Sequence, residues 1–161
     1  MYNKEIERKW LVKREKMPDL SKYPSIRIKQ GYLSQLHDSL MVRVREEDDG
    51  HAIKHTLDLK DSGTKIRNEI TFNISKEEFD ISYLLAGQKI IKKRRFLIPS
   101  TGDKSRILEV DVFEDLDLIV VEYESDNETM VDTLKTEDWF DLEVTEDYAY
   151  TNIQLAYSKI K

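Results

Sequence analysis

The stretch EIERKWLV, residues 5–12, decides how this chain folds. Successive side chains of a β-strand point to opposite faces, so Glu5, Glu7 and Lys9 share one face while Ile6 and Trp10 share the other. Two carboxylates and an ammonium group side by side suit a site that holds metal cations and a polyanion together. The stretch therefore predicts a strand with one packing face and one functional face.

The same alternation recurs in strands expected over residues 39–46, 51–60, 65–74, 89–98, 106–114 and 118–125. Each of them carries two charged residues on one face. The charged positions are Arg43, Arg45, Asp58, Lys60, Arg67, Glu69, Lys93, Arg95, Glu109, Asp111, Glu122 and Glu124. This recurrence indicates a mainly β protein whose charged face continues from strand to strand.

Further elements follow from turn and capping signals. Two more strands are expected over residues 3–12 and 26–33, and the DDG and DSG sequences at 48–50 and 61–63 indicate antiparallel hairpins. Ser75 and Glu78 form a capping-box pattern that predicts a helix ending near Gly87. Two C-terminal helices are also expected, at residues 133–140 and 151–161.

Composition bounds the class of protein. The 161 residues include 36% charged and 39% hydrophobic residues, with a formal net charge of −6, which argues against a broad nucleic-acid-binding surface. The absence of cysteine excludes disulfides and thiolate chemistry. The N-terminus has no apolar signal-peptide core, and no apolar run is long enough for a membrane span. We expect one domain over residues 1–161 in a cytoplasmic protein, either monomer or homodimer, that binds neither nucleic acid nor membrane.

Two arrangements of the charged face remain open. In an ordinary sheet it would be the solvated outer face. In a closed barrel it would line the lumen, which must then be wet or filled by a ligand, because unpaired charge in a dry interior is costly. The positions are almost purely ionic, which favours the barrel. Lys and Arg would neutralise phosphate oxygens there, and carboxylates would hold Mg²⁺ or Mn²⁺.

These motifs, in this order, resemble those of the CYTH superfamily, the triphosphate tunnel metalloenzymes. Residues 5–9 resemble its Glu-x-Glu-x-Lys signature, VRVR at 42–45 its paired-arginine strand, and TLDLK at 56–60 its Thr-Ile-Lys strand. Further matches are Arg67-x-Glu69, Lys93-x-Arg95-Phe96, the acidic strands at 109–114 and 121–124, and the C-terminal segment at 143–152. The resemblance covers nearly the whole chain and is greatest to the compact bacterial inorganic triphosphatases.

The resemblance implies an α+β fold, a closed eight-stranded antiparallel β-barrel with a charged lumen and helices packed outside. It implies hydrolysis of inorganic triphosphate to pyrophosphate and phosphate by metal-activated water, with Mg²⁺ or Mn²⁺ as cofactor. The residues implied as catalytic are Glu5, Glu7 and Lys9. Those implied to bind triphosphate are Lys9, Arg43, Arg45, Lys60, Lys93 and Arg95. Those implied to hold metal are Glu5, Glu7, Asp111, Glu122 and Glu124.

Four residues are supporting candidates: Arg67, Glu69, Glu109 and Tyr32. Arg67 either contacts the substrate or pairs with a lumen carboxylate. Glu69 either binds metal or orients a basic residue. Tyr32 either reaches the site or packs beside it. The resemblance does not choose between these roles.

The chain departs from the family pattern at three positions. Thr71 stands where a second Glu often follows Arg-x-Glu, which removes one lumen carboxylate. Leu108 stands where an aromatic residue often precedes the Glu-x-Asp strand. Asp58 stands where a neutral residue is more usual, and we interpret it as an incidental charge at the barrel rim. None of the three removes a cationic phosphate contact.

Other functions stay open at this point. The same tunnel would suit a class IV-type adenylate cyclase, in which the ribose 3′-oxygen attacks the α-phosphate and pyrophosphate leaves. It would also suit a nucleoside- or thiamine-triphosphatase, which needs an aromatic or apolar platform at the tunnel mouth. A non-catalytic polyphosphate- or nucleotide-binding module is the alternative outside enzymes.

Overall fold

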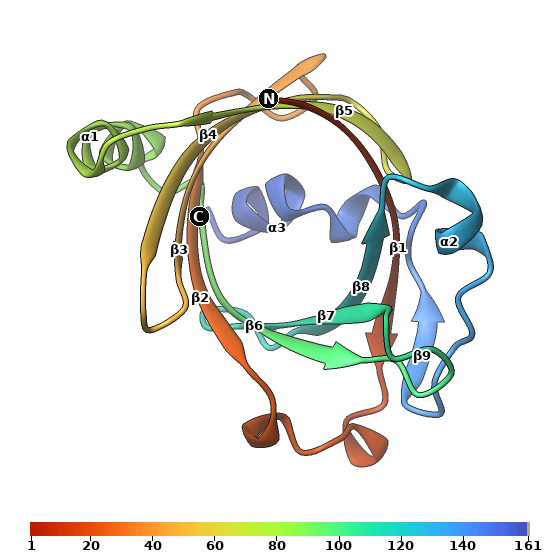
Figure 1. Cartoon of the computed structure of the whole chain (residues 1–161). Helices are drawn as coiled ribbons and strands as arrows, with labels where there is room; N and C mark the ends of the chain where they lie inside the picture. The colour runs from red at the N-terminus through yellow and green to blue at the C-terminus, as the bar shows by residue number, and fades with distance from the viewer. Residues whose placement is uncertain (161) are drawn as a thin grey trace.

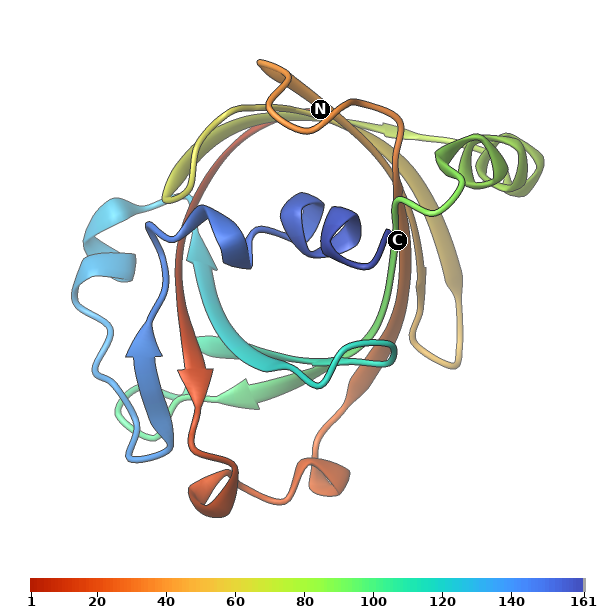
Figure 2. The ribbon, with the colours of Figure 1, turned by 180° about the vertical axis from the view of Figure 1, so that it is seen from behind.

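The structure is a computed structural model that describes residues 1–160. Eight antiparallel strands form a closed barrel in the order β5-β4-β3-β2-β6-β7-β8-β1, and β1 pairs back to β5 (Figures 1 and 2). The prediction of a closed eight-stranded antiparallel barrel is therefore confirmed. The strands are β1 (Tyr2–Val12), β2 (Ser25–Tyr32), β3 (Leu40–Asp48), β4 (Ile53–Asp61), β5 (Ile66–Asn73), β6 (Ile90–Pro99), β7 (Ile107–Phe113) and β8 (Ile119–Ser125).

The first strand closes the barrel because it pairs with different partners along its length. Its residues 2–6 pair with β5, and its residues 6–11 pair with β8. A short extra strand, β9 (Phe140–Glu143), pairs with residues 10–12 of β1, beyond the part that β5 occupies. Strand β1 thus pairs with β5 and β9 along one edge and with β8 along the other.

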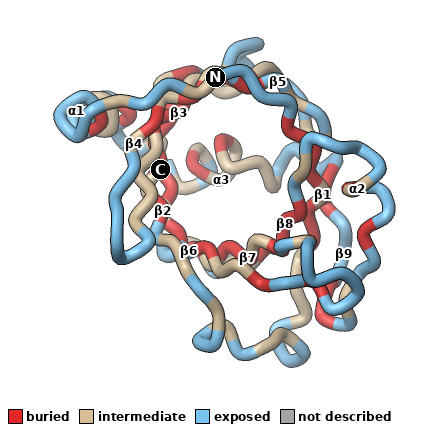
Figure 3. Tube along the Cα trace, viewed as in Figure 1, coloured by how far each residue is buried: buried red, intermediate tan, exposed pale blue. Residues whose placement is uncertain are grey.

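An apolar layer covers the outer wall of β1, β7 and β8. Trp10 and Val121 are buried there beneath α2 (Glu128–Asp132) and the segment that leads to β9. The ring of Phe140 lies 4.8 Å, between centroids, from the rings of both Trp10 and Trp139. Figure 3 shows this part of the wall as largely buried. The packing face predicted from EIERKWLV therefore points outward.

Helix α1 (Lys76–Ala86) packs on the outside of β2, β3 and β4. Ser75 and Glu78 form the expected capping box, in which each side chain accepts from the other residue's backbone N–H. Gly31 of β2 lets the helix approach closely, because a Cβ at Gly31 would lie only 2.8 Å from the Cβ of Ala86. The absence of a side chain at Gly31 consequently lets α1 pack directly on the backbone of β2.

Helix α3 (Asn152–Ser158) lies across one end of the barrel (Figures 1 and 2). Its buried residues Ile153 and Ala156 pack on an apolar layer at that end of the lumen. The fully or nearly fully buried residues of that layer are Tyr32, Ile91, Phe113 and Val120. The helix and this layer together restrict access to the lumen from one side.

The prediction of a helix at residues 133–140 is wrong. The helix in this region is α2, which has Thr133 as its C-cap, and Phe140 already belongs to β9. The side chain of Asn127 accepts from the first backbone N–H groups of α2, so the helix begins earlier than the apolar pattern suggested. Residues 134–140 instead follow the outer wall, where packing outweighs helix propensity.

Short 3₁₀ turns complete the fold. The turns η1 (Arg14–Lys16) and η2 (Leu20–Lys22) precede β2, and η3 (Tyr148–Tyr150) precedes α3. The helix expected at residues 151–161 includes residue 161, which lies outside the described part of the chain. Among residues 1–160, no helix is both long enough and apolar enough to cross a membrane.

Candidate active site

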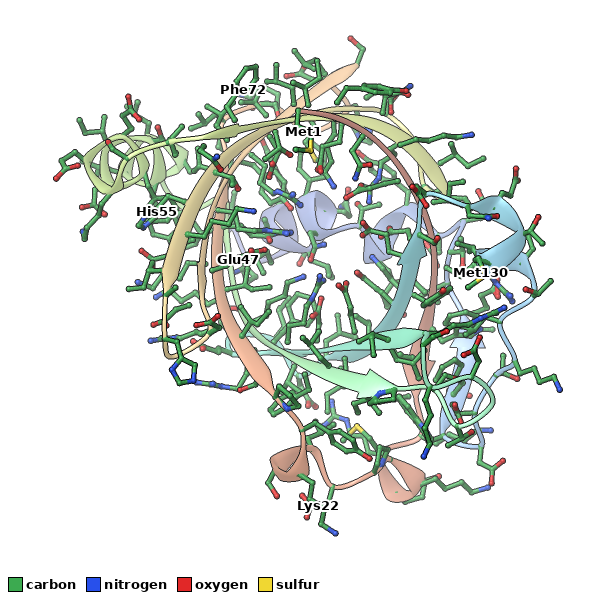
Figure 4. All side chains as sticks on the ribbon, in the orientation of Figure 1. Met1, Lys22, Glu47, His55, Phe72 and Met130 are labelled. Atoms are coloured by element: carbon green, nitrogen blue, oxygen red, sulfur yellow. The ribbon has the colours of Figure 1, made fainter. Side chains whose placement is uncertain are left out.

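The lumen contains a belt of buried charged side chains from β1 and from β3 to β8. Figure 4 shows side chains with nitrogen and oxygen atoms projecting into the ring from its wall. The buried members are Glu5, Glu7, Lys9, Arg43, Asp58, Lys60, Glu69, Lys93, Arg95, Asp111 and Glu122. Arg45, Arg67 and Glu109 are half-buried, and Glu124 is exposed. The strands thus bring together all the charged residues that the motifs predicted.

Asp111 is the centre of the belt and is completely inaccessible to solvent. Its carboxylate accepts from Lys93 Nζ at 2.5 Å and from Arg95 Nε and Nη2 at 2.7 and 2.8 Å. Burial lowers the pKa of Lys93 to about 8, although Asp111 opposes that shift. Both oxygens of Asp111, which was predicted as a metal ligand, are therefore already engaged by the side chains of Lys93 and Arg95.

Lys9 and Glu122 form a second buried pair, with Nζ and Oε1 3.0 Å apart. Arg95 Nη2 also donates to Glu122, at 3.2 Å. Burial opposes ionisation of Glu122, but Lys9 and Arg95 outweigh it and hold the pKa of Glu122 well below its usual range. The backbone carbonyl of Tyr150 accepts from Lys9 Nζ at 3.1 Å, so the segment before α3 fixes this lysine.

A third group surrounds Lys60, whose Nζ lies 2.6 Å from Glu5 Oε2 and 2.8 Å from Glu69 Oε2. Arg67 Nη2 contacts Glu7 at 3.1 Å and Glu5 at 3.6 Å. Burial would raise the pKa of Glu5, but Lys60 and Arg67 lower it to about 2. Arg67 thus pairs with lumen carboxylates, and Glu69 contacts a basic residue.

The interpretation of Asp58 as a rim charge is wrong. Asp58 is only 2% exposed, and its Oδ2 accepts from Arg43 Nε at 2.9 Å and from Arg43 Nη2 at 2.7 Å. The alternation along β4 correctly places it on the charged face. Its depth in the barrel depends on strand stagger, which brings Arg43 and Asp58 into register.

A cavity of about 210 Å³ opens beside the belt. Glu47 and Lys54, partners in the β3–β4 ladder, line it together with belt residues. The complete lining is Glu5, Arg43, Arg45, Glu47, Lys54, Thr56, Asp58, Glu69, Thr71, Arg95, Glu109 and Glu124. Every one of these residues is polar or charged, so the cavity offers both cationic and anionic groups to a ligand.

Glu124 lies close enough to two other carboxylates of this cavity, Glu5 and Glu109, to be repelled by both. Desolvation by the lumen wall, followed by repulsion from Glu5 and Glu109, raises the pKa of Glu124 to about 8. Desolvation also raises the pKa of Glu109, against the effect of Arg95. Glu124 forms no ion pair within residues 1–160, and the same residues contain no preformed cluster of three metal ligands. A cation placed among the three carboxylates would relieve their repulsion.

Tyr32 packs at the closed end of the lumen, and its hydroxyl accepts from Gln30 Nε2 at 2.7 Å. Gln30 Oε1 in turn accepts from Arg45 Nε and Nη2 at 3.2 and 3.0 Å. Tyr32 therefore supports Arg45 through Gln30. A second cavity of about 50 Å³ lies on the side of α3, between Tyr148, Asn152 and the belt.

Comparison with known proteins gives the chain a family. It is 30% identical, over 96% of its length and 97% of the relative's, to a protein of Nitrosomonas europaea named inorganic triphosphatase. The chain belongs to the family of this protein. A crystal structure of an inorganic triphosphatase matches with a TM-score of 0.68 at 28% identity, covering 94% of this chain and 93% of that one. No protein-family model matches the sequence.

More distant structures in the comparison share the fold. A protein of Pyrococcus horikoshii OT3 superimposes with a TM-score of 0.56 at 20% identity, over 80% of this chain and 83% of its own. The fold is thus shared with a protein more distant than the triphosphatase relative.

The motifs missed three residues of the lumen that the structure reveals. Lys54 and Glu47 line the open cavity, and Gln30 is completely buried beside Arg45. The signal was available for Glu47 and Lys54, since Glu47 lies one step of the alternation beyond Arg45 and Lys54 two steps before Asp58. Gln30 shares the face of Tyr32 by the same alternation, but its contact with Arg45 depends on the pairing of β2 with β3.

Proposed function

We propose that this chain is a metal-dependent triphosphatase of the CYTH superfamily that hydrolyses inorganic triphosphate to pyrophosphate and phosphate. The name of its Nitrosomonas relative supports the substrate class. The observation that carries the proposal is the open cavity, whose lining consists only of polar and charged residues of both signs. A triphosphate with bound divalent cations presents matching charges of both signs.

The belt would hold the phosphate chain through six cations: Lys9, Arg43, Arg45, Lys60, Lys93 and Arg95. All of them except Arg45 are buried and fixed by carboxylates before substrate arrives. Such fixed charges stabilise developing negative charge without reorganising during the reaction. Lys93, with its pKa near 8, would be held in its charged form by an incoming phosphate.

The donor set fits Mg²⁺ or Mn²⁺. Hard divalent cations take carboxylate oxygens, and the repulsion of Glu124 by Glu5 and Glu109 supports a place for a cation beside Glu124. We propose Glu5, Glu109 and Glu124 as metal ligands. Glu7, Asp111 and Glu122, which the family resemblance also implies as metal-holding residues, would lie beside them. When bound, the cation would activate water and offset charge on phosphate oxygens.

The chain's own groups would then act as follows. Glu5 has a pKa of about 2, so it stays ionised and only accepts hydrogen bonds at neutral pH. It would orient the attacking water together with Glu7. Lys9, held between Glu122 and the Tyr150 carbonyl, would neutralise charge on the phosphoryl group as it transfers. No histidine base is needed in this arrangement.

The lining also favours inorganic over organic triphosphates. A nucleoside or thiamine group would need an aromatic or apolar platform, and the open cavity has none among the residues described. Adenylate cyclization would require a site for the ribose and base beside the same phosphates. We therefore rank inorganic triphosphate first among the substrates.

The test is release of phosphate from inorganic triphosphate with Mg²⁺ or Mn²⁺, with ATP as a parallel substrate. Glu5→Gln is compared with the wild type, and Glu114→Gln on the outer wall serves as a control because Glu114 is exposed and pairs with exposed Arg27. Metal-dependent release from triphosphate, little from ATP and loss in Glu5→Gln are expected. Pyrophosphate release from ATP would indicate a cyclase, and inertness toward both would indicate a binding module.

A further inference from the structure

A row of three side chains crosses β3, β4 and β5 inside the lumen. Arg43 is the register partner of Asp58, and Asp58 is the partner of Thr71. Two nitrogens of Arg43, Nε and Nη2, donate to Asp58 Oδ2 at 2.9 and 2.7 Å, while Thr71 Oγ1 donates to Asp58 Oδ1 at 2.9 Å. Each oxygen of Asp58 therefore has its own partner.

Arg43 is held so that part of its guanidinium remains available. Its Nε and Nη2 are engaged by Asp58, and Nη2 also lies 3.5 Å from Glu69 Oε2. Its Nη1 donates to no residue within the described 1–160 range. Arg43 lines both the open cavity and the smaller cavity near α3. Arg43 thus lies between the two cavities, and its Nη1 is not engaged by any of the described residues.

Asp58 and Thr71 are cross-strand neighbours joined by a hydrogen bond. The row therefore spans three adjacent strands and carries its carboxylate on β4.

We propose that Asp58 is a positioning residue that fixes the guanidinium of Arg43 with Nη1 toward the phosphate chain, and that Thr71 fixes Asp58. The inference rests on the proposed function, since it assigns a phosphate-binding role to Arg43. Asp58 itself touches no substrate in this arrangement. A planar guanidinium held on one side presents its remaining donor in a single direction.

The test is a double-mutant cycle with Asp58→Asn and Arg43→Gln, measured as kcat and KM for inorganic triphosphate. Asp58→Asn should lower kcat/KM by about tenfold to a hundredfold, as expected for a misplaced contact. Most of the loss should fall on kcat, because removing a lumen carboxylate does not weaken attraction of a polyanion. In the Arg43→Gln background Asp58→Asn should have little further effect.

Thr71→Val keeps both charges and most of the volume, so it tests the row if Asp58→Asn folds poorly. It should lower kcat/KM by about fivefold, the size of one lost hydrogen bond. Glu114→Gln, an outer-wall carboxylate, is the control and should change kcat/KM by less than about twofold. Urea unfolding of each variant gives the folded fraction by which its rate is corrected.

Two results would overturn the positioning role. One is an equal loss from Asp58→Asn in the wild-type and Arg43→Gln backgrounds. The other is a lower urea midpoint with kcat and KM unchanged. If the wild type does not hydrolyse triphosphate, the proposed function fails by itself. The same cycle is then measured on the Kd for inorganic triphosphate by calorimetry, where additive losses would again contradict the inference.

Discussion

The two ends of the lumen are built from the inward faces of the same strands, yet their chemistry is opposite. At the end under α3, Tyr32, Ile91 and Phe113 are buried against Ile153. At the other end the strands carry charged residues around an open cavity, among them Glu47 and Lys54. The difference shows that alternation decides which residues face inward, while the inward positions that are ionic are either paired with an opposite charge or open to the cavity.

The largest loss of stability is expected when an ion pair of the charged belt between the two ends is removed. Arg95→Gln leaves Asp111 and Glu122 with one cation fewer in a dry environment. We expect its free energy of unfolding to fall by about 3–5 kcal/mol. Urea denaturation measures this. Arg94→Gln, on the outward face of the same strand and bonded to Ser25, should lie within about 0.5 kcal/mol of the wild type. Equal effects of the two variants would refute the inward orientation.

The apolar end is tested by Ile153→Ala in α3. The side chain is 7% exposed and packs on the end layer, so its truncation should lower the free energy of unfolding by about 2–3 kcal/mol. The affinity for inorganic triphosphate should stay within about twofold, because the binding groups lie in the belt and open cavity. Calorimetric titration checks this separation. A large loss of triphosphate affinity without loss of stability would mean that the apolar end contributes to binding.

The open end is tested by Glu124→Gln. The neutral side chain removes repulsion with Glu5 and Glu109, so stability in the absence of metal should be unchanged or slightly higher. Mg²⁺ affinity should fall by about tenfold or more, as for loss of a metal-site group. Thermal unfolding and metal titration give the two readouts. Lower stability with unchanged Mg²⁺ affinity would exclude Glu124 as a metal ligand.

The smallest expected effect is the pH dependence of stability that Glu124 gives to the open end. The pKa of Glu124 is raised from 4.5 to about 8, so between these values the folded protein binds more protons than the unfolded chain. The contribution of Glu124 to stability is therefore present below about pH 4.5 and is lost as the pH rises toward 8. The difference in stability between metal-free wild type and Glu124→Gln should shift over this window. A difference independent of pH would contradict the raised pKa.

Much of the fold could be predicted from the alternation of residues. The first strand was expected at residues 3–12 and spans Tyr2–Val12, and the charged face of the barrel points inward as predicted. The region at 133–140 could not be predicted, because its apolar residues pack on Trp10 of a distant strand. Local periodicity contains no information about that contact.

The candidate site was predictable in its residues but not in their pairing. Asp111 and Glu124 follow the same every-second-residue pattern, yet Asp111 is enclosed by two cations while Glu124 forms no ion pair with any residue that the structure describes. Asp58 looked peripheral although it is buried beside Arg43. These differences depend on the stagger between strands and on their depth along the barrel axis. Neither quantity can be read from the sequence of a single strand.

The most direct test of the central claim is the Kd for inorganic triphosphate, measured by calorimetry with Mg²⁺ for two arginine variants. Arg45→Gln changes a half-buried residue of the open cavity, and Arg94→Gln changes an exposed residue of the outer wall. If the charged lumen binds the phosphate chain, Arg45→Gln should weaken binding by about tenfold, as for a lost charge-assisted contact, and Arg94→Gln by less than about twofold. Equal weakening by both variants, or none by Arg45→Gln, would contradict the account.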